Sequence, residues 1–249
     1  MTDPRLPGPD LLVLWDIDLT LVDYSGIGRK WYGEAMTAAH GLPIVHVPAF
    51  PGRTERSITA ELLTAHGVEV TETAVQALFT ELIAIAEAAR ADLPELGRAL
   101  PGAAALLAAL AERPNVVQSL VTGNLPELAA CKLEAFDLHH HLDFEVGGYG
   151  GLSADRHDLV SAAIAAAGAK YGTAFDPARV VVIGDTPHDV AAALHHGAIG
   201  VGVATGRSTV AELRESGAQL VLEDLSDTPT ALAALMDAAS TGSTPGTSP

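Results

Sequence analysis

The stretch LLVLWDIDLTLVD, residues 11–23, decides the fold of this chain. The five apolar residues from Leu11 to Trp15 predict a fully buried strand. Two carboxylates, Asp16 and Asp18, follow at the carboxyl end of that strand, where open α/β sheets bind ligands. Acidic side chains seldom stand beside a core strand unless a cation meets them. We therefore expect a cation such as Mg²⁺ here, with one carboxylate that attacks and a second that moves a proton.

Composition narrows the class of protein. The 249 residues suffice for one domain or two unequal ones, and 48 % of them are hydrophobic. The net charge of −17 and the scarcity of Lys and Arg argue against nucleic acid as a partner. No apolar run reaches the roughly 18 residues of a membrane span, and the N-terminus lacks the pattern of a secretory signal. The single Cys131 cannot form an internal disulfide, so we expect a cytoplasmic location.

The first strand is followed by a predicted all-helical insertion, residues 26–96. Helical stretches extend from Ile27 to His40, from Glu55 to His66 and from Thr71 to Arg90. An insertion at this point lies over the carboxyl edge of the sheet, where a lid belongs. Residues 240–249 contain only Ser, Thr, Gly and Pro, and we expect them to form a disordered tail.

Beyond the insertion, helices and strands alternate, which predicts a parallel sheet covered by helices on both faces. The predicted fold class is therefore α/β, with a Rossmann-like core made of residues 1–25 and 97–239. Helices are expected at 103–112, 125–135, 156–167, 187–196, 209–216 and 229–239, and strands at 116–121, 144–146, 179–183, 199–203 and 219–222.

A second strand ends in groups suited to phosphate. Thr122, Gly123 and Asn124 follow the strand 116–121 and precede a helix. Backbone N–H groups at a helix N-terminus, together with the helix dipole, favour a bound anion. We expect these three residues to contribute to a phosphate site.

A third strand ends in groups suited to metal. Asp185 and Asp189 follow the strand 179–183, and Pro187 places them near the start of a helix, where both can approach one cation. Acids and hydroxyls also serve as plain helix caps. Three strand ends of this kind in one sheet nevertheless favour a shared site.

Together these motifs resemble those of the haloacid dehalogenase superfamily, over nearly all of the chain except the tail. The first motif is the run from Asp16 to Thr20, the second is Thr122, and the fourth is the run from Gly184 to Asp189. The resemblance implies that Asp16 is a nucleophile that forms an aspartyl-phosphate. It also implies that Asp18 protonates the leaving oxygen and then takes a proton from water.

The third motif of this superfamily is a Lys or Arg that precedes the strand of the fourth motif. We assign it to Arg156, with Lys132 as the rival and Lys170 as a weaker one. Arg156 and Thr122 are then expected to hold the phosphoryl oxygens. Leu19 stands where relatives usually have glycine, so we expect altered motion of this turn rather than lost chemistry.

The resemblance also implies a metal site. Mg²⁺ is expected to be held by Asp16, the backbone carbonyl of Asp18, and Asp185. Asp189 is then expected either to bind the ion directly or to contact the residues that bind it.

The helical insertion resembles the C1-type cap of phosphoglycolate phosphatases and β-phosphoglucomutases. Within it, residues 51–56 look like the cap loop that reaches into the site. Arg53, with Thr54 beside it, is a candidate for binding the far end of the substrate. The alternative is a surface arginine next to Thr54 acting as a helix N-cap.

We therefore expect a Mg²⁺-dependent phosphatase that acts on a small phosphorylated metabolite. The alternative is a phosphomutase of the β-phosphoglucomutase type, although mutase relatives usually lack a threonine at the position of Thr20. A dehalogenase is disfavoured by Asp18, and a non-catalytic phosphate-binding protein by the completeness of the motifs. The sequence determines neither the physiological substrate nor the oligomeric state.

Overall fold

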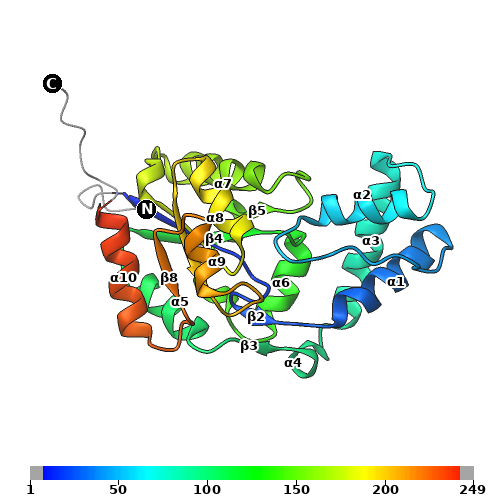
Figure 1. Cartoon of the computed structure of the whole chain (residues 1–249), viewed down its shortest axis with the longest axis horizontal. Coiled ribbons are helices and arrows are strands. Elements are labelled where there is room, and N and C mark those ends of the chain that lie inside the picture. Colours follow the sequence, from blue (N-terminus) through cyan, green and yellow to red (C-terminus); the bar gives the residue numbers. More distant parts are fainter. Residues whose placement is uncertain (1–7, 242–249) are drawn as a thin grey trace.

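The computed structural model describes residues 8–241. Its central sheet consists of β1 (Leu11–Trp15), β4 (Val116–Thr122), β5 (Gly148–Tyr149), β6 (Val180–Gly184), β7 (Ile199–Val203) and β8 (Leu220–Leu222). The strands lie in the order β5-β4-β1-β6-β7-β8, and all of them are parallel. The predicted α/β class is confirmed, and Figure 1 shows this sheet in the larger part of the molecule.

The strand β1 lies in the middle of the sheet and is buried along its whole length. Successive side chains of a strand point to opposite faces. Trp15 accordingly joins one hydrophobic core, and Leu12 and Leu14 join the other. Burial on both faces explains why this strand is an unbroken apolar run rather than an alternating one.

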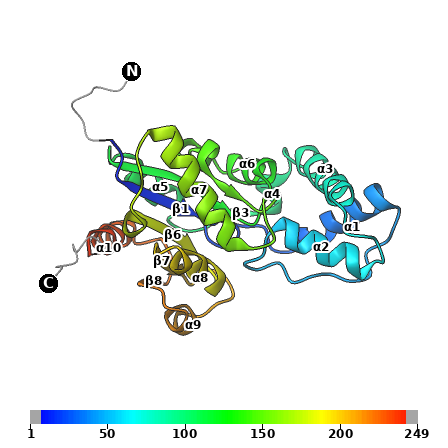
Figure 2. The ribbon, with the colours of Figure 1, turned by 90° about the horizontal axis from the view of Figure 1, so that it is seen from above.

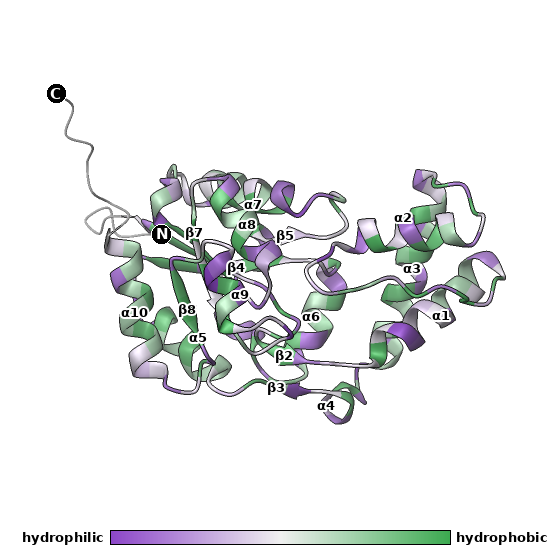
Figure 3. Cartoon of the chain, in the orientation of Figure 1, coloured by the Kyte–Doolittle hydropathy of each residue, from purple (hydrophilic) through white to green (hydrophobic). Residues whose placement is uncertain are grey.

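Helices cover both faces of the sheet, as predicted. They are α5 (Ala103–Ala111), α6 (Pro126–Glu134), α7 (Arg156–Tyr171), α8 (Pro187–His195), α9 (Val210–Glu215) and α10 (Thr228–Thr241). The apolar faces of α5 and α10 belong to the core that contains Trp15, and those of α7 and α8 belong to the opposite core. Figure 3 shows that the strands between these two layers are predominantly hydrophobic.

A second group of helices stands apart from the sheet, at its carboxyl edge (Figures 1 and 2). The group consists of α1 (Ile27–His40), α2 (Glu55–Ala65) and α3 (Glu72–Ala88). These helices share a buried apolar core, and α3 also packs against α6. A cavity between them and the sheet edge is lined by residues of both parts of the chain.

Two short strands join these parts. The chain leaves the sheet through β2 (Val22–Asp23) and returns through α4 (Leu93–Leu96) and β3 (Arg98–Ala99). The strands β2 and β3 pair in antiparallel fashion. The outgoing and returning segments are thus held together at the base of the helical group.

One strand prediction is wrong. Residues Phe144–Val146 form a 3-10 helix, and the edge strand is β5 instead. The Asp143 side chain accepts a hydrogen bond from the backbone N–H of Glu145 (3.1 Å), which turns the chain before an extended conformation can continue.

The C-terminal helix extends further than the sequence predicts. It continues through Ser240 and Thr241, the first two residues of the expected tail, while residues 242–249 lie outside the described chain. Among the helices of residues 8–241, none combines the length and hydropathy of a membrane span.

Candidate active site

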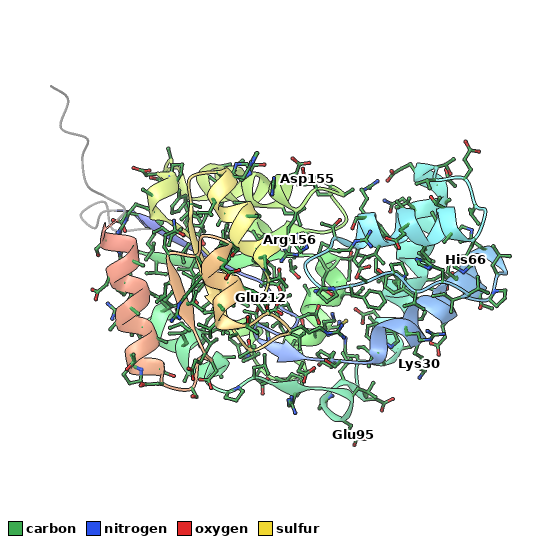
Figure 4. The ribbon with its side chains drawn as sticks, in the orientation of Figure 1. Lys30, His66, Glu95, Asp155, Arg156 and Glu212 are labelled. Carbon is green, nitrogen blue, oxygen red and sulfur yellow. The ribbon has the colours of Figure 1, made fainter. Side chains whose placement is uncertain are left out.

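Three neighbouring strands bring the predicted site residues to one edge of the sheet. Asp16 follows β1, Thr122 ends β4 and Asp185 follows β6, on the side that faces α1–α3. The backbone N–H of Asp16 donates to the carbonyl of Ile183 (2.8 Å), which extends the pairing of β1 with β6 to the site. Figure 4 labels Arg156 in this same region, between the sheet and the helices α1–α3, which we call the outer helices.

Arg156, the first residue of α7, is buried between two carboxylates. Its Nη2 lies 2.8 Å from Oδ1 of Asp16 and 2.5 Å from Oδ1 of Asp189. All three side chains are less than one-tenth exposed. Within the described chain, the Nε of Arg156 has no hydrogen-bond partner. A spare buried donor beside Asp16 indicates a place for an anionic oxygen.

Three buried carboxylates could hold a metal ion. Asp16, Asp185 and Asp189 each place one oxygen within 4.8 Å of the others. Burial raises the pKa of Asp16 to about 7, against the opposing charge of Arg156, and burial together with the charge of Asp16 raises that of Asp185 to about 8. A shared cation would stabilise the ionised forms, and oxygen donors fit a hard divalent ion. The backbone of Gly206 packs closely against this group, because a Cβ there would lie 1.7 Å from Oδ2 of Asp185.

Asp189 also belongs to the N-terminus of α8. Its Oδ2 accepts hydrogen bonds from the backbone N–H (3.1 Å) and the hydroxyl (2.7 Å) of Thr186, as in a capping box. A Cβ at Gly184 would lie 2.2 Å from the carboxyl carbon of Asp189, so the close approach requires glycine. Since one oxygen of Asp189 serves the cap and the other faces Arg156, this residue is well placed to orient the guanidinium.

Lys132, the rival candidate for the third motif, meets a different carboxylate. Its Nζ lies 2.8 and 2.7 Å from the two oxygens of Asp18 and 2.7 Å from Oδ1 of Asn124. The amide of Asn124 donates in turn to Asp18 (2.8 Å) and to the hydroxyl of Thr122 (2.9 Å). Lys132 and Arg156 therefore have separate partners, Asp18 for the lysine and Asp16 for the arginine.

Gly123 allows the loop before α2 to approach the sheet. A Cβ at Gly123 would lie 2.0 Å from the carbonyl oxygen of Arg53. The carbonyl of Gly123 accepts a hydrogen bond from the backbone N–H of Glu55 (2.8 Å). Thr54, between them, is the N-cap of α2 and accepts from the backbone N–H of Ser57 (3.1 Å). Gly123 thus allows this loop to lie at the edge of the site.

The guanidinium of Arg53 is engaged within the helical group. Its Nη1 pairs with Glu61, and its Nη2 donates to the carbonyl of Ser57 (2.9 Å). Arg53 does line the cavity. For Arg53 to bind substrate, as the sequence predicts, these contacts would have to be exchanged for contacts with the ligand.

Leu19 occupies a conformation that suits glycine. Its φ is 63°, in the left-handed region, where a side chain costs roughly 1–2 kcal/mol. This cost is the physical reason why glycine would suit this position better than leucine. The backbone N–H of Leu19 donates to the carbonyl of Val22 (2.7 Å), and its own carbonyl accepts from the hydroxyl of Thr205 (2.6 Å). The turn that carries Asp18 is therefore tied to the loop after β7.

A cavity of about 400 Å³ lies between the sheet edge and the outer helices. Asp16, Asp18 and Arg156 line it on the sheet side, and Arg207, an exposed residue after β7, also borders it. On the side of α1–α3 it is lined by Trp31, Tyr32, Phe50 and Glu55. Tyr24 lines it near α6, where its hydroxyl donates to the carbonyl of Lys132 (3.3 Å).

The sequence analysis did not identify the polar groups on the outer wall of this cavity. Glu55 is only 8 % exposed, and its carboxylate accepts a hydrogen bond from the hydroxyl of Tyr32. In the sequence, Glu55 looks like an ordinary acidic residue in the first turn of a helix. Its place within the predicted cap loop, residues 51–56, is the signal that could have identified it.

The chain is similar to known proteins in sequence and in fold. Residues 13–194 match the family model of haloacid dehalogenase-like hydrolases. A hydrolase from Pseudomonas syringae is 25 % identical, with a TM-score of 0.64 over 90 % of this chain and 99 % of its own. No curated protein matches the chain.

Two further solved structures are similar in fold alone, because their identities are lower. A predicted phosphoglycolate phosphatase from Haemophilus somnus is 18 % identical, with a TM-score of 0.59 over 90 % of this chain and 97 % of its own. A β-phosphoglucomutase from Clostridium difficile is 12 % identical, with a TM-score of 0.61 over 94 % of this chain and 98 % of its own.

Proposed function

Since the chain belongs to the family of haloacid dehalogenase-like hydrolases, we propose that it is a Mg²⁺-dependent phosphatase of a small phosphorylated metabolite. The observation that carries the proposal is the contact between Arg156 and Asp16, with a spare buried N–H of Arg156 beside it. A carboxylate repels a phosphate dianion, so attack on phosphorus requires a cation held against both. The contact of Arg156 with Asp16 supports the proposal.

The chemistry proceeds in two steps on the residues of the chain. An oxygen of Asp16 attacks phosphorus, the bond from phosphorus to the leaving oxygen breaks, and Asp18 supplies the proton that the leaving oxygen takes up. Water then attacks the aspartyl-phosphate, Asp18 takes its proton, and the bond from phosphorus to Asp16 breaks. Arg156 and Thr122 hold the phosphoryl oxygens throughout, and Lys132 holds Asp18 in place.

The residues present fit a divalent cation. Asp16 and Asp185 would hold Mg²⁺, together with the backbone carbonyl of Asp18, and Asp189 would either join them or orient Arg156. When bound, the ion neutralises charge on the phosphoryl oxygens and on the nucleophile. Without it, two buried carboxyl groups with raised pKa values face the substrate, and their proton-bound forms are poor nucleophiles and poor ligands.

We also propose separate roles for the two parts of the chain, the core and the cap. Residues 1–25 and 97–239 would form the core that carries out the chemistry. Residues 26–96 would form the cap that selects the substrate and limits access of water. The proposal is supported by the cavity, whose walls come from both parts.

The test is a phosphate-release assay on the full chain. A panel of phosphorylated metabolites and p-nitrophenyl phosphate is incubated with Mg²⁺, with EDTA, and with the Asp16→Asn variant. We expect phosphate release that needs both the ion and Asp16. Release that survives either control would contradict the mechanism, and an isomeric sugar phosphate in place of free phosphate would favour the phosphomutase.

A further inference from the structure

The outer wall of the cavity has a chemistry that phosphoryl transfer does not use. Tyr, Trp and Phe make up only 4 % of the chain, yet three of them line this one wall: Trp31, Tyr32 and Phe50. The rings of Tyr32 and Phe50 stack with their centroids 5.5 Å apart. We call these three residues the aromatic wall. The faces of such rings carry partial negative charge and attract cations.

Glu55 adds a carboxylate to the aromatic wall. Among the described residues, no lysine or arginine forms an ion pair with it. The charge of Lys132 acts on Glu55, but its ammonium donates to Asp18 and Asn124. Burial raises the pKa of Glu55 to about 8 despite Lys132. A buried carboxylate is costly without a cationic partner, and a cation on a bound ligand would supply one.

We propose that Glu55 and the aromatic wall form an ammonium subsite, so that the substrate is a phosphomonoester of an amino alcohol. The inference rests on the proposed function, because it assigns the leaving group of that reaction. The phosphate of such a substrate meets Arg156 on the sheet side, and its ammonium meets Glu55 on the opposite wall. An ester with an anionic leaving group is the opposing possibility, because the exposed Arg207 could attract it to the entrance.

The substrate test compares esters that differ in one group. Initial rates are measured with Mg²⁺ for phosphoethanolamine and phosphocholine, for the neutral 2-hydroxyethyl phosphate, and for the anionic phosphoglycolate. We expect kcat/KM for the ammonium esters to exceed that of the neutral ester by about tenfold or more, the scale of one cation–π and carboxylate contact. Equal values, or a preference for phosphoglycolate, overturn the inference.

The Glu55→Gln variant tests the carboxylate itself, because glutamine keeps the size of the side chain and its contact with Tyr32. We expect it to lower kcat/KM for the ammonium esters by about tenfold more than for the neutral ester. Glu69→Gln is the matched control, since Glu69 is an exposed glutamate before α3, and the preference should persist in it. Equal losses for both kinds of ester in Glu55→Gln contradict the subsite.

A binding measurement separates the inference from the proposed function. Choline and its neutral isostere 3,3-dimethylbutanol are titrated into the wild-type chain while the melting temperature is followed. We expect choline, but not 3,3-dimethylbutanol, to raise the melting temperature of the wild-type chain. In Glu55→Gln, choline should no longer raise it. If p-nitrophenyl phosphate is hydrolysed but choline does not bind, the subsite is wrong and the phosphatase stands. If no ester is hydrolysed, the phosphatase is wrong, and choline binding alone decides the subsite.

Discussion

Replacing Lys132 by methionine removes one charge from the site and keeps nearly the same length of side chain. Three contacts of the ammonium are lost, two to Asp18 and one to Asn124. The side chain of Asp18 is 43 % exposed, so water can replace its lost partner. Asn124 is only 4 % exposed, and its carbonyl oxygen is left without a donor. An unsatisfied buried acceptor costs about 1–3 kcal/mol.

The expected loss of stability is therefore about 2 kcal/mol. It is the cost of the unpaired acceptor, partly offset because the variant no longer buries an ammonium group. For a chain of this size, the loss corresponds to a fall in Tm of about 4–8 °C. Catalysis suffers separately, since Asp18 loses the partner that fixes its position. We expect kcat to fall about tenfold or more, with little change in KM.

The assay is a thermal melt together with steady-state hydrolysis of p-nitrophenyl phosphate. Lys170→Met is the matched control, since Lys170 pairs with Asp143 and Glu145 on the surface and does not line the cavity. Exposed pairs contribute about 0–1 kcal/mol, so this control should keep its activity and nearly its full Tm. An unchanged kcat in Lys132→Met would refute the positioning role, and a rise in KM alone would mean that Lys132 binds substrate instead.

Three further predictions follow from the same site. Arg156→Met should lower kcat/KM by about 10²–10³, with partial recovery in Arg156→Lys, and a smaller loss than in Lys132→Met would reverse the assignment of the third motif. Gly123→Ala should force the loop at Arg53 away from the sheet and destabilise the protein by about 1–3 kcal/mol, as chemical denaturation would measure. Because Asp16 and Asp185 have raised pKa values in the metal-free protein, they retain protons that Mg²⁺ must displace. Calorimetry should therefore show Mg²⁺ affinity rising between about pH 6 and pH 8 and levelling off above, whereas a flat profile would contradict these shifts.

The elements that were predicted at their observed bounds have strong local signals. The strands β1 and β7 are buried on both faces, which leaves an unbroken apolar run in the sequence. The helix α1 is bounded by Gly26 and Gly41, both with left-handed φ values. By contrast, β2 and β3 have two residues each, too few for any periodicity to appear.

Some features of the candidate site could likewise be predicted from the sequence, and others could not. Which strand ends meet follows from the order of a parallel sheet, and the sequence could therefore predict that Asp16, Thr122 and Asp185 share one edge. Whether Lys132 faces Asp18 depends on the rotation of α6 about its axis, which is set by packing against α3. The partner of Arg53 depends similarly on the side chain of Glu61, two turns along α2. Such pairings arise from tertiary contacts that no local pattern encodes.

The most direct test of a metal-assisted attack by Asp16 is a crystal grown with Mn²⁺ and measured at its absorption edge. We expect one anomalous peak about 2.1 Å from carboxylate oxygens of both Asp16 and Asp185. A second group, formed by Asp137, His139 and His140, could also hold an ion at the surface. A peak at that group alone, with none between Asp16 and Asp185, would contradict the proposed mechanism.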